Sequence, residues 1–249
     1  GMVAQSWMFP EQWYITNIAK KSEVINGLKW ENYLSKYIRI STPEVFGSVD
    51  ETITEEHPFN PSTPYALSHA TIDQHLMLKN NENGFPYIIS RYANFYGPGQ
   101  QIYRIIPKAL FLALSNQKLT LDGGGSSERA FIYKDDIISS LQAIINHGTI
   151  GESYHFSDTV CISIKSLAAQ IAECCGINYE NFTTIGAERK GKDQRYFMSA
   201  DKAFNALGWK PKTPLKNGIE KTRKWIFASK DFITPNLLNY THVFRDSHE

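Results

Sequence analysis

The residues best suited to chemistry in this 249-residue chain are Tyr65 and His69, four positions apart. Ser62 or Thr63 would cap a helix here and Pro64 suits its first position, so the phenol and the imidazole would lie one turn apart on one face. A phenol with a pKa of roughly 10 needs a nearby positive charge to act as a base at pH 7. Histidine, with an ordinary pKa of about 6.5, mostly does not supply that charge. The pair therefore predicts either a proton-transfer site that lacks its cation or an ordinary amphipathic helix.

Alternating strand and helix patterns predict the elements that would position this pair. Two buried strands of a parallel sheet are expected at residues 37–46 and 87–95. Helices are expected at residues 10–29, 64–83, 105–114, 136–146, 163–175, 199–207 and 215–228. Gly123-Gly124-Gly125 lacks the Lys-Ser/Thr of a phosphate loop, so it is expected to be a turn. The pattern predicts an α/β protein.

Five segments in order resemble the NAD-dependent epimerase/dehydratase family, the extended short-chain dehydrogenases, and especially its dTDP-glucose 4,6-dehydratases. They are ISTPEVFG at 40–47, Tyr65-x-x-x-His69 where the family has Tyr-x-x-x-Lys, RYANFYGPGQ at 91–100, LDGGGSSERAFIYKDD at 121–136, and KDQRY at 192–196 with ALGWKP at 206–211. The resemblance runs from about Ala4 to Trp225. It implies an incomplete Rossmann-like parallel sheet flanked by helices (2–98, with later strands returning to it), a smaller C-terminal α/β substrate lobe (99–230) and a C-terminal arm (231–249).

The resemblance also implies catalytic roles. Thr42 matches a hydroxyl residue that hydrogen-bonds the reacting oxygen of the sugar, and Glu44 matches a glutamate that takes a proton from it. Tyr65 matches the catalytic tyrosine, and His69 stands where the family has lysine. Pro43 replaces the family's aspartate, and a proline has no proton to give, so elimination of water loses its acid.

Binding roles follow from the same resemblance. It implies that a nucleoside-diphosphate sugar is bound by Asn94, Arg129 and Arg195. The guanidinium groups of the two arginines suit the phosphate oxygens. It assigns contacts with the cofactor NAD to Ala4, Gln5, Ser6 and Tyr65, the first three as the end of a strand. The family's glycine-rich pyrophosphate turn is absent from the sequence, which predicts a fragment that begins inside the fold and binds NAD weakly on its own.

Two hypotheses of different classes remain open. The first is an NAD-dependent nucleotide-sugar epimerase or dehydratase that is catalytically incomplete as this chain and takes its nucleotide-binding half from a longer chain or a separate one. The second is a non-catalytic nucleotide-sugar-binding protein. The changes at residues 43 and 69 and the missing glycine turn favour the second hypothesis.

Composition limits the classes of binding partner and the cellular location that are expected for the protein. A formal charge of +1 with scattered Lys and Arg gives little support for nucleic-acid binding. The sequence has no apolar run of membrane-spanning length and no secretory leader, which predicts a cytoplasmic protein. Three cysteines, two of them adjacent, suit reduced thiols, and the seven histidines form no metal-ligand motif.

Association with a second copy is also expected. The helices at residues 10–29 and 64–80 correspond to the pair through which family members commonly form a four-helix dimer interface. Trp13, Tyr14, Ile72 and Leu76 are expected on their outer faces. The chain is therefore predicted to be a homodimer.

Overall fold

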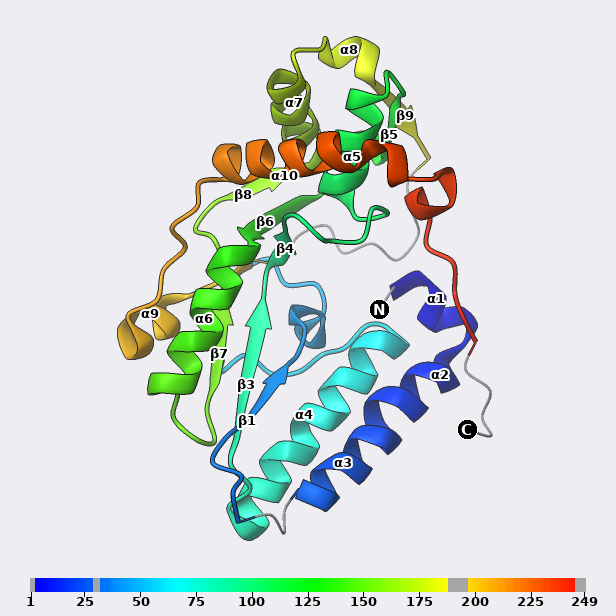
Figure 1. The fold of residues 1–249 in the computed structure, drawn as a ribbon. Helices are drawn as coiled ribbons and strands as arrows, with labels where there is room; N and C mark the ends of the chain where they lie inside the picture. Colours follow the sequence, from blue (N-terminus) through cyan, green and yellow to red (C-terminus); the bar gives the residue numbers. More distant parts are fainter. Residues whose placement is uncertain (1–2, 29–31, 188–196, 245–249) are drawn as a thin grey trace.

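A parallel sheet flanked by helices forms the centre of the molecule (Figure 1). The computed structural model describes residues 3–28, 32–187 and 197–244. The sheet has the strand order β1–β3–β7, formed by Tyr37–Ile40, Tyr87–Tyr92 and Ser153–Phe156, and all its pairings are parallel. The predicted α/β class with a parallel sheet is confirmed.

Helix α4 (Pro64–Asn83) carries the Tyr65 pair, and its ends follow from local sequence. The Thr63 hydroxyl accepts a hydrogen bond from the backbone N–H of Ala66 at 3.1 Å, and Pro64 occupies the first turn. Gly84, with a φ of +72°, ends the helix in the left-handed conformation that glycine adopts without steric cost. The predicted cap and stop are confirmed.

The predicted helix at residues 10–29 is interrupted by a π-helical turn. It consists of α2 (Pro10–Tyr14), the π-helix η1 (Ile15–Ala19) and α3 (Lys20–Leu28), preceded by the short helix α1 (Val3–Met8). These segments pack beside α4 (Figure 1). π-Helical turns are rare and occur frequently at functional sites.

The expected outer apolar faces of these helices are not where the sequence analysis placed them. Trp13, Ile72 and Leu76 are buried inside the chain, where Ile72 and Leu76 pack with Ile25 and Ile89. The helices turn their apolar stripes toward the sheet and toward each other because this buries them within one chain. The stated argument for a dimer is therefore wrong for these residues.

The opposite face of the sheet is covered by α6 (Lys134–His147) and α9 (Asp201–Leu207) (Figure 1). Ile88 of β3 packs in the same core as Ile144, and the Trp209 indole donates to the backbone oxygen of Asp136 at 3.1 Å. A small parallel pair, β2 (Thr52–Ile53) with β10 (Phe197–Met198), lies in this layer. The residues that follow α9 are thereby tied to the sheet.

A second core lies beyond the carboxyl end of β3, at the top of Figure 1. Its helices are α5 (Ile105–Leu114), α7 (Ile164–Cys175), α8 (Tyr179–Phe182) and α10 (Leu215–Ser229). Its strands are the pair β5 (Leu119–Asp122) with β9 (Thr183–Gly186) and the sheet β4–β6–β8, formed by Asn94–Tyr96, Glu128–Tyr133 and Cys161–Ser163. The glycine run at 123–125 is a short 3-10 turn, η3, as predicted.

Beyond α10, the chain returns to the first helices. The turns η4 (Lys230–Phe232) and η5 (Pro235–Leu238) lead down to α1 and α2 (Figure 1). The His242 ring stacks on Phe9 and on Trp13, each at a centroid distance of 5.2 Å, and Phe244 packs edge-on against Phe9. The described part of the expected C-terminal arm at 231–249 is thus anchored to the first helices by aromatic contacts.

Candidate functional site

Tyr65 and His69 face each other at the N-terminal end of α4. Their ring centroids are 4.6 Å apart at an angle of 45°, with Tyr65 half-buried and His69 buried. Burial raises the pKa of Tyr65 to about 12, and the charge of Glu44 acts in the same direction. A hydrogen bond with Thr42 and the charges of Arg104 and Arg39 oppose that rise. Tyr65 is therefore a protonated phenol at neutral pH and has a proton to donate to a hydrogen-bond acceptor.

Thr42 and Glu44 are brought to Tyr65 by the turn that follows β1. The expected strand over residues 37–46 ends at Ile40, and residues 43–46 form a 3-10 turn, η2, because Pro43 cannot donate to a sheet ladder. Thr42 caps this turn, and its hydroxyl accepts from the Glu44 backbone N–H at 3.4 Å. Three of the expected site residues, Thr42, Glu44 and Tyr65, are therefore neighbours.

His69 is held as a neutral acceptor. A guanidinium nitrogen of Arg39, Nη2, lies 2.9 Å from His69 Nδ1. Arginine has no acceptor and stays charged in proteins, so Nδ1 must carry the lone pair and the ring proton sits on Nε2. Burial, together with the charges of Arg39 and Lys21, lowers the pKa of His69 to about 2. The ring therefore carries no positive charge at pH 7.

A buried ion cluster beneath α4 was not anticipated from the sequence. Asp73 Oδ1 accepts from Arg39 Nε at 3.2 Å, and Oδ2 accepts from Arg91 Nη2 at 2.8 Å and from the Ser41 hydroxyl. Asp73 and Arg91 are fully buried and Arg39 is 5% exposed. Side chains alternate along a strand, so Arg39 of β1 and Arg91 of β3 reach the same helix.

A second polar chain links the first helices to Tyr65. Lys21 Nζ donates to Asn17 Oδ1 at 3.0 Å, and Asn17 Nδ2 donates to the Ser68 hydroxyl at 3.0 Å. Ser68 in turn donates to the backbone oxygen of Tyr65 at 2.7 Å. Asn17 lies in the π-helical turn, which aims its side chain at α4. Burial lowers the pKa of Lys21 to about 8.

The expected substrate residues lie above this group. Asn94 begins β4, directly after the carboxyl end of β3, and pairs with Phe131 of β6. Arg129 lies on β6 two residues before Phe131, and its Nη1 donates to the backbone oxygen of Glu128 at 2.7 Å. Arg195 lies outside the described residues. Ligands of open α/β sheets bind at the carboxyl ends of the strands, where Thr42 and Asn94 lie.

The expected cofactor contacts at Ala4, Gln5 and Ser6 do not form a strand end. They lie in helix α1, where the buried Ser6 hydroxyl donates to the backbone oxygen of Val3 at 2.6 Å. A strand needs a ladder partner, whereas a helix satisfies its own backbone and packs on α2 and α4. The strand assignment of these residues is therefore wrong.

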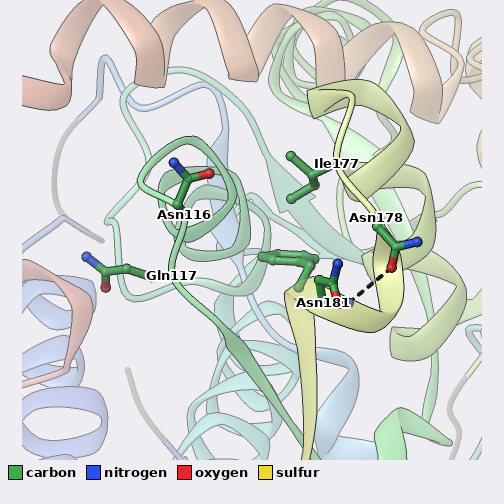
Figure 2. A pocket seen from close by; sticks show the side chains of 6 residues that line it. Asn116, Gln117, Ile177, Asn178 and Asn181 are labelled. Atoms are coloured by element: carbon green, nitrogen blue, oxygen red, sulfur yellow. Dashed lines mark hydrogen bonds between the residues drawn. The ribbon is translucent and has the colours of Figure 1, made fainter.

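A hollow lined by side-chain amides lies in the second core. Figure 2 shows a hollow of about 320 Å³ whose lining includes the side-chain amides of Asn116, Gln117, Asn178 and Asn181. It lies at the end of the second core beside α8, away from helix α4, which carries Tyr65 (Figure 1). Asn178 Oδ1 already caps α8 by accepting from the Asn181 backbone. Within residues 3–28, 32–187 and 197–244, no cluster of His, Cys, Asp or Glu could hold a metal ion, and no helix is long and apolar enough to cross a membrane.

Comparison with known proteins gives the family. The family model of GDP-mannose 4,6 dehydratase matches residues 1–222. The dTDP-D-glucose 4,6-dehydratase of Homo sapiens is 33% identical over 201 residues, which are 78% of this chain and 57% of that protein. That of Neisseria gonorrhoeae is 30% identical over 210 residues, 78% of this chain and 60% of that protein. The chain thus spans less than two thirds of the length of these relatives.

Solved structures agree. The crystal structure of DesIV, the dTDP-glucose 4,6-dehydratase of Streptomyces venezuelae, with NAD and TYD bound, superposes with a TM-score of 0.88 at 26% identity. The match covers 94% of this chain and 73% of that one. The resemblance stated from the five sequence segments is thereby confirmed. The chain belongs to the GDP-mannose 4,6-dehydratase family and has the Rossmann-like fold of the NAD-dependent epimerases and dehydratases that act on nucleotide sugars.

Proposed function

We propose that this chain binds a nucleoside-diphosphate sugar beside Tyr65, at the carboxyl ends of β1 and β3. The grouping of Thr42, Glu44 and Tyr65 at this edge carries the proposal. A half-buried phenol that interacts with a threonine hydroxyl offers donors and acceptors to a sugar hydroxyl at one point. DesIV, which has the same fold, holds NAD and TYD.

Binding suits this geometry better than proton abstraction. With a pKa of about 12, Tyr65 keeps its proton at pH 7 and donates to a sugar oxygen rather than accepting a proton from it. Pro43, buried at the start of η2, has no proton to give an eliminated hydroxyl. The favoured function is therefore that of a nucleotide-sugar-binding protein, and the alternative is one half of a two-chain enzyme.

Arg129 is the proposed contact for the diphosphate, with Arg195 as a second one. A guanidinium binds phosphate oxygens through two parallel hydrogen bonds. Loss of one such charge-assisted contact costs about 1.5–3 kcal/mol, which is roughly a tenfold or larger loss of affinity. Asn94, close to β6 in the strand pairing, is proposed to contact the sugar or its first phosphate.

The described residues do not fit the pyrophosphate of NAD. A pyrophosphate cradle needs glycines with backbone N–H groups open to the ligand at a strand-to-helix turn. The glycine turn at 123–125 is instead packed against α7, since a Cβ on Gly125 would lie 2.9 Å from the backbone nitrogen of Lys165. We therefore propose that NAD binds this chain weakly, through Tyr65 at most, and that tight binding requires a separate or additional polypeptide with the glycine-rich turn.

A homodimer and a cytoplasmic location complete the proposal. Exposed apolar side chains remain on the first helices and on α4, at Ile15, Leu67 and Leu78. A second copy would remove them from water. The three cysteines are free thiols, which suits a reducing compartment such as the cytoplasm.

Calorimetric titration tests the binding proposal. The chain is titrated with dTDP-, UDP-, GDP- and CDP-glucose, and the best ligand is then repeated with Arg129→Ala. A matched control is Lys216→Ala, which removes a cation that is 80% exposed on α10. We expect one ligand to bind, about tenfold or more weakly to Arg129→Ala and equally to Lys216→Ala. Absence of binding by all four, or unchanged affinity of Arg129→Ala, would contradict the proposal.

A further inference from the structure

The charges around Tyr65 do not sum to zero. Asp73 is a single carboxylate that serves two guanidinium groups, those of Arg39 and Arg91, so the buried cluster has one cation more than its central anion. Glu55 adds a more distant negative charge, which interacts with Arg91. Burial raises the pKa of the Glu55 carboxyl, which makes this group easier to protonate than an exposed glutamate. Arg39 is thus the less compensated of the two guanidiniums.

The geometry directs Arg39 toward Tyr65. Its Nε is bound to Asp73 at 3.2 Å, while Nη2 points along α4 to His69 Nδ1 at 2.9 Å. The His69 ring thus contacts both the Arg39 guanidinium, through Nδ1, and the Tyr65 ring, whose centroid is 4.6 Å away. A hydrogen bond from a cation polarises a neutral imidazole, and low local dielectric strengthens the effect. The positive charge of Arg39 therefore reaches Tyr65 through one uncharged ring.

The other charged groups around Tyr65 come from each packed element. Lys21 of α3 and Arg91 of β3 act on the His69 ring, and Arg104, which precedes α5, acts on Tyr65 more strongly than Arg39 does. Glu44 of η2 is the opposing anion. Lys21 reaches the Tyr65 backbone through Asn17 and Ser68, not the phenol. Arg39 is the cation with a direct hydrogen bond to the ring that contacts Tyr65.

We propose that Arg39 is a positioning residue that supplies positive charge to the Tyr65 site, and that His69 is its neutral, Nδ1-accepting spacer. This deepens the proposed function, because the charge makes Tyr65 a stronger donor to a sugar oxygen. A lysine at position 69 would face Arg39 and Lys21, so His69→Lys creates repulsion rather than restoring a site.

Nuclear magnetic resonance of the ligand-free protein tests the arrangement independently of sugar binding. Histidines are labelled with ¹⁵N and ¹³C, and His69 is assigned with His69→Gln. We expect His69 to remain neutral with its proton on Nε2 from pH 5 to 9 in the unmodified protein. In Arg39→Met, we expect the ¹⁵N shift of Nδ1 to change, because this nitrogen loses its hydrogen-bond donor, while burial keeps the ring neutral. A protonated Nδ1 in the unmodified protein would overturn the proposal even if Arg39→Met fails to fold.

The phenol gives the second readout. Site-specific 3,5-difluorotyrosine at position 65 lowers the intrinsic pKa of the phenol into a range in which the protein is folded, and ¹⁹F shifts follow its titration. We expect the pKa of this phenol to rise in Arg39→Met by more than in the exposed control Lys216→Met, and to stay within about 0.3 pH units in Arg39→Lys. An unchanged pKa in folded Arg39→Met would refute the role of Arg39. If these titrations give the expected results but the protein binds no nucleotide sugar, the proposed function is refuted and the role of Arg39 stands.

Discussion

Asp73→Asn should lower the free energy of unfolding far more than the loss of one exposed carboxylate would. The carboxylate is fully buried and accepts three hydrogen bonds, from Arg39, Arg91 and Ser41. The amide keeps the shape but removes the carboxylate that both buried guanidiniums contact. Breaking a buried ion pair by removing one partner costs about 3–5 kcal/mol. We expect a loss of that size in the free energy of unfolding, measured by urea denaturation at pH 7.

The matched control is Glu173→Gln on α7. Glu173 forms a comparable pair with Lys216 at 3.0 Å, but both side chains are at least 70% exposed. Exposed pairs contribute about 0–1 kcal/mol, so the control should lose less than about 1 kcal/mol. Arg39→Met combined with Asp73→Asn should cost less than the sum of the two single variants, because the double variant buries one unpaired cation fewer. A loss in Asp73→Asn no larger than in Glu173→Gln would refute the buried cluster.

Three further outcomes are expected. Gly218→Ala should lose about 1–3 kcal/mol of stability, because the added Cβ would overlap the Tyr96 hydroxyl oxygen. Gly27→Ala, in open space on α3, should gain about 0.5–1 kcal/mol. Thermal unfolding of the two variants measures both changes. Burial lowers the pKa of Lys21 from 10.5 to about 8, so the unfolded state binds more protons between these values. Stability should therefore rise with pH across that window, and urea denaturation at stepped pH should show that Lys21→Met abolishes the rise. Burial raises the pKa of Cys174 to about 12, so only about one thiol in ten thousand is ionised at pH 8, and labelling by a disulfide reagent should be far slower in the folded protein than in urea.

The sequence predicts α4 well because its signals are local. Thr63 and Gly84 act within a few residues of the helix ends, so neither depends on the rest of the fold. The same holds for α7, where the Ser163 hydroxyl accepts from the Ser166 backbone and Gly176 ends the helix. The candidate residues Thr42, Glu44 and Tyr65 also came from the sequence, through a resemblance carried by short motifs, and the structure places them together.

The ion cluster escaped the sequence analysis because its partners are distant along the chain. Arg39 and Asp73 are 34 residues apart, and nothing local pairs them. A signal was nevertheless present: Arg39 lies in a strand whose neighbours are apolar, and Asp73 lies among the buried residues of α4. A buried charge requires a partner, which predicts that each has one. The orientation of Trp13 and Ile72 was missed because an apolar stripe alone does not tell which surface it packs against.

A crystal structure with the best-binding nucleoside-diphosphate sugar tests the central claim most directly. The account predicts that a sugar hydroxyl lies within hydrogen-bond distance of the Tyr65 hydroxyl and Thr42 Oγ1, with the diphosphate on the side of Arg129. Arg39 should keep its hydrogen bond to His69 in that complex. A ligand bound in the hollow of Figure 2, or anywhere that leaves Tyr65 and Thr42 untouched, would contradict the account.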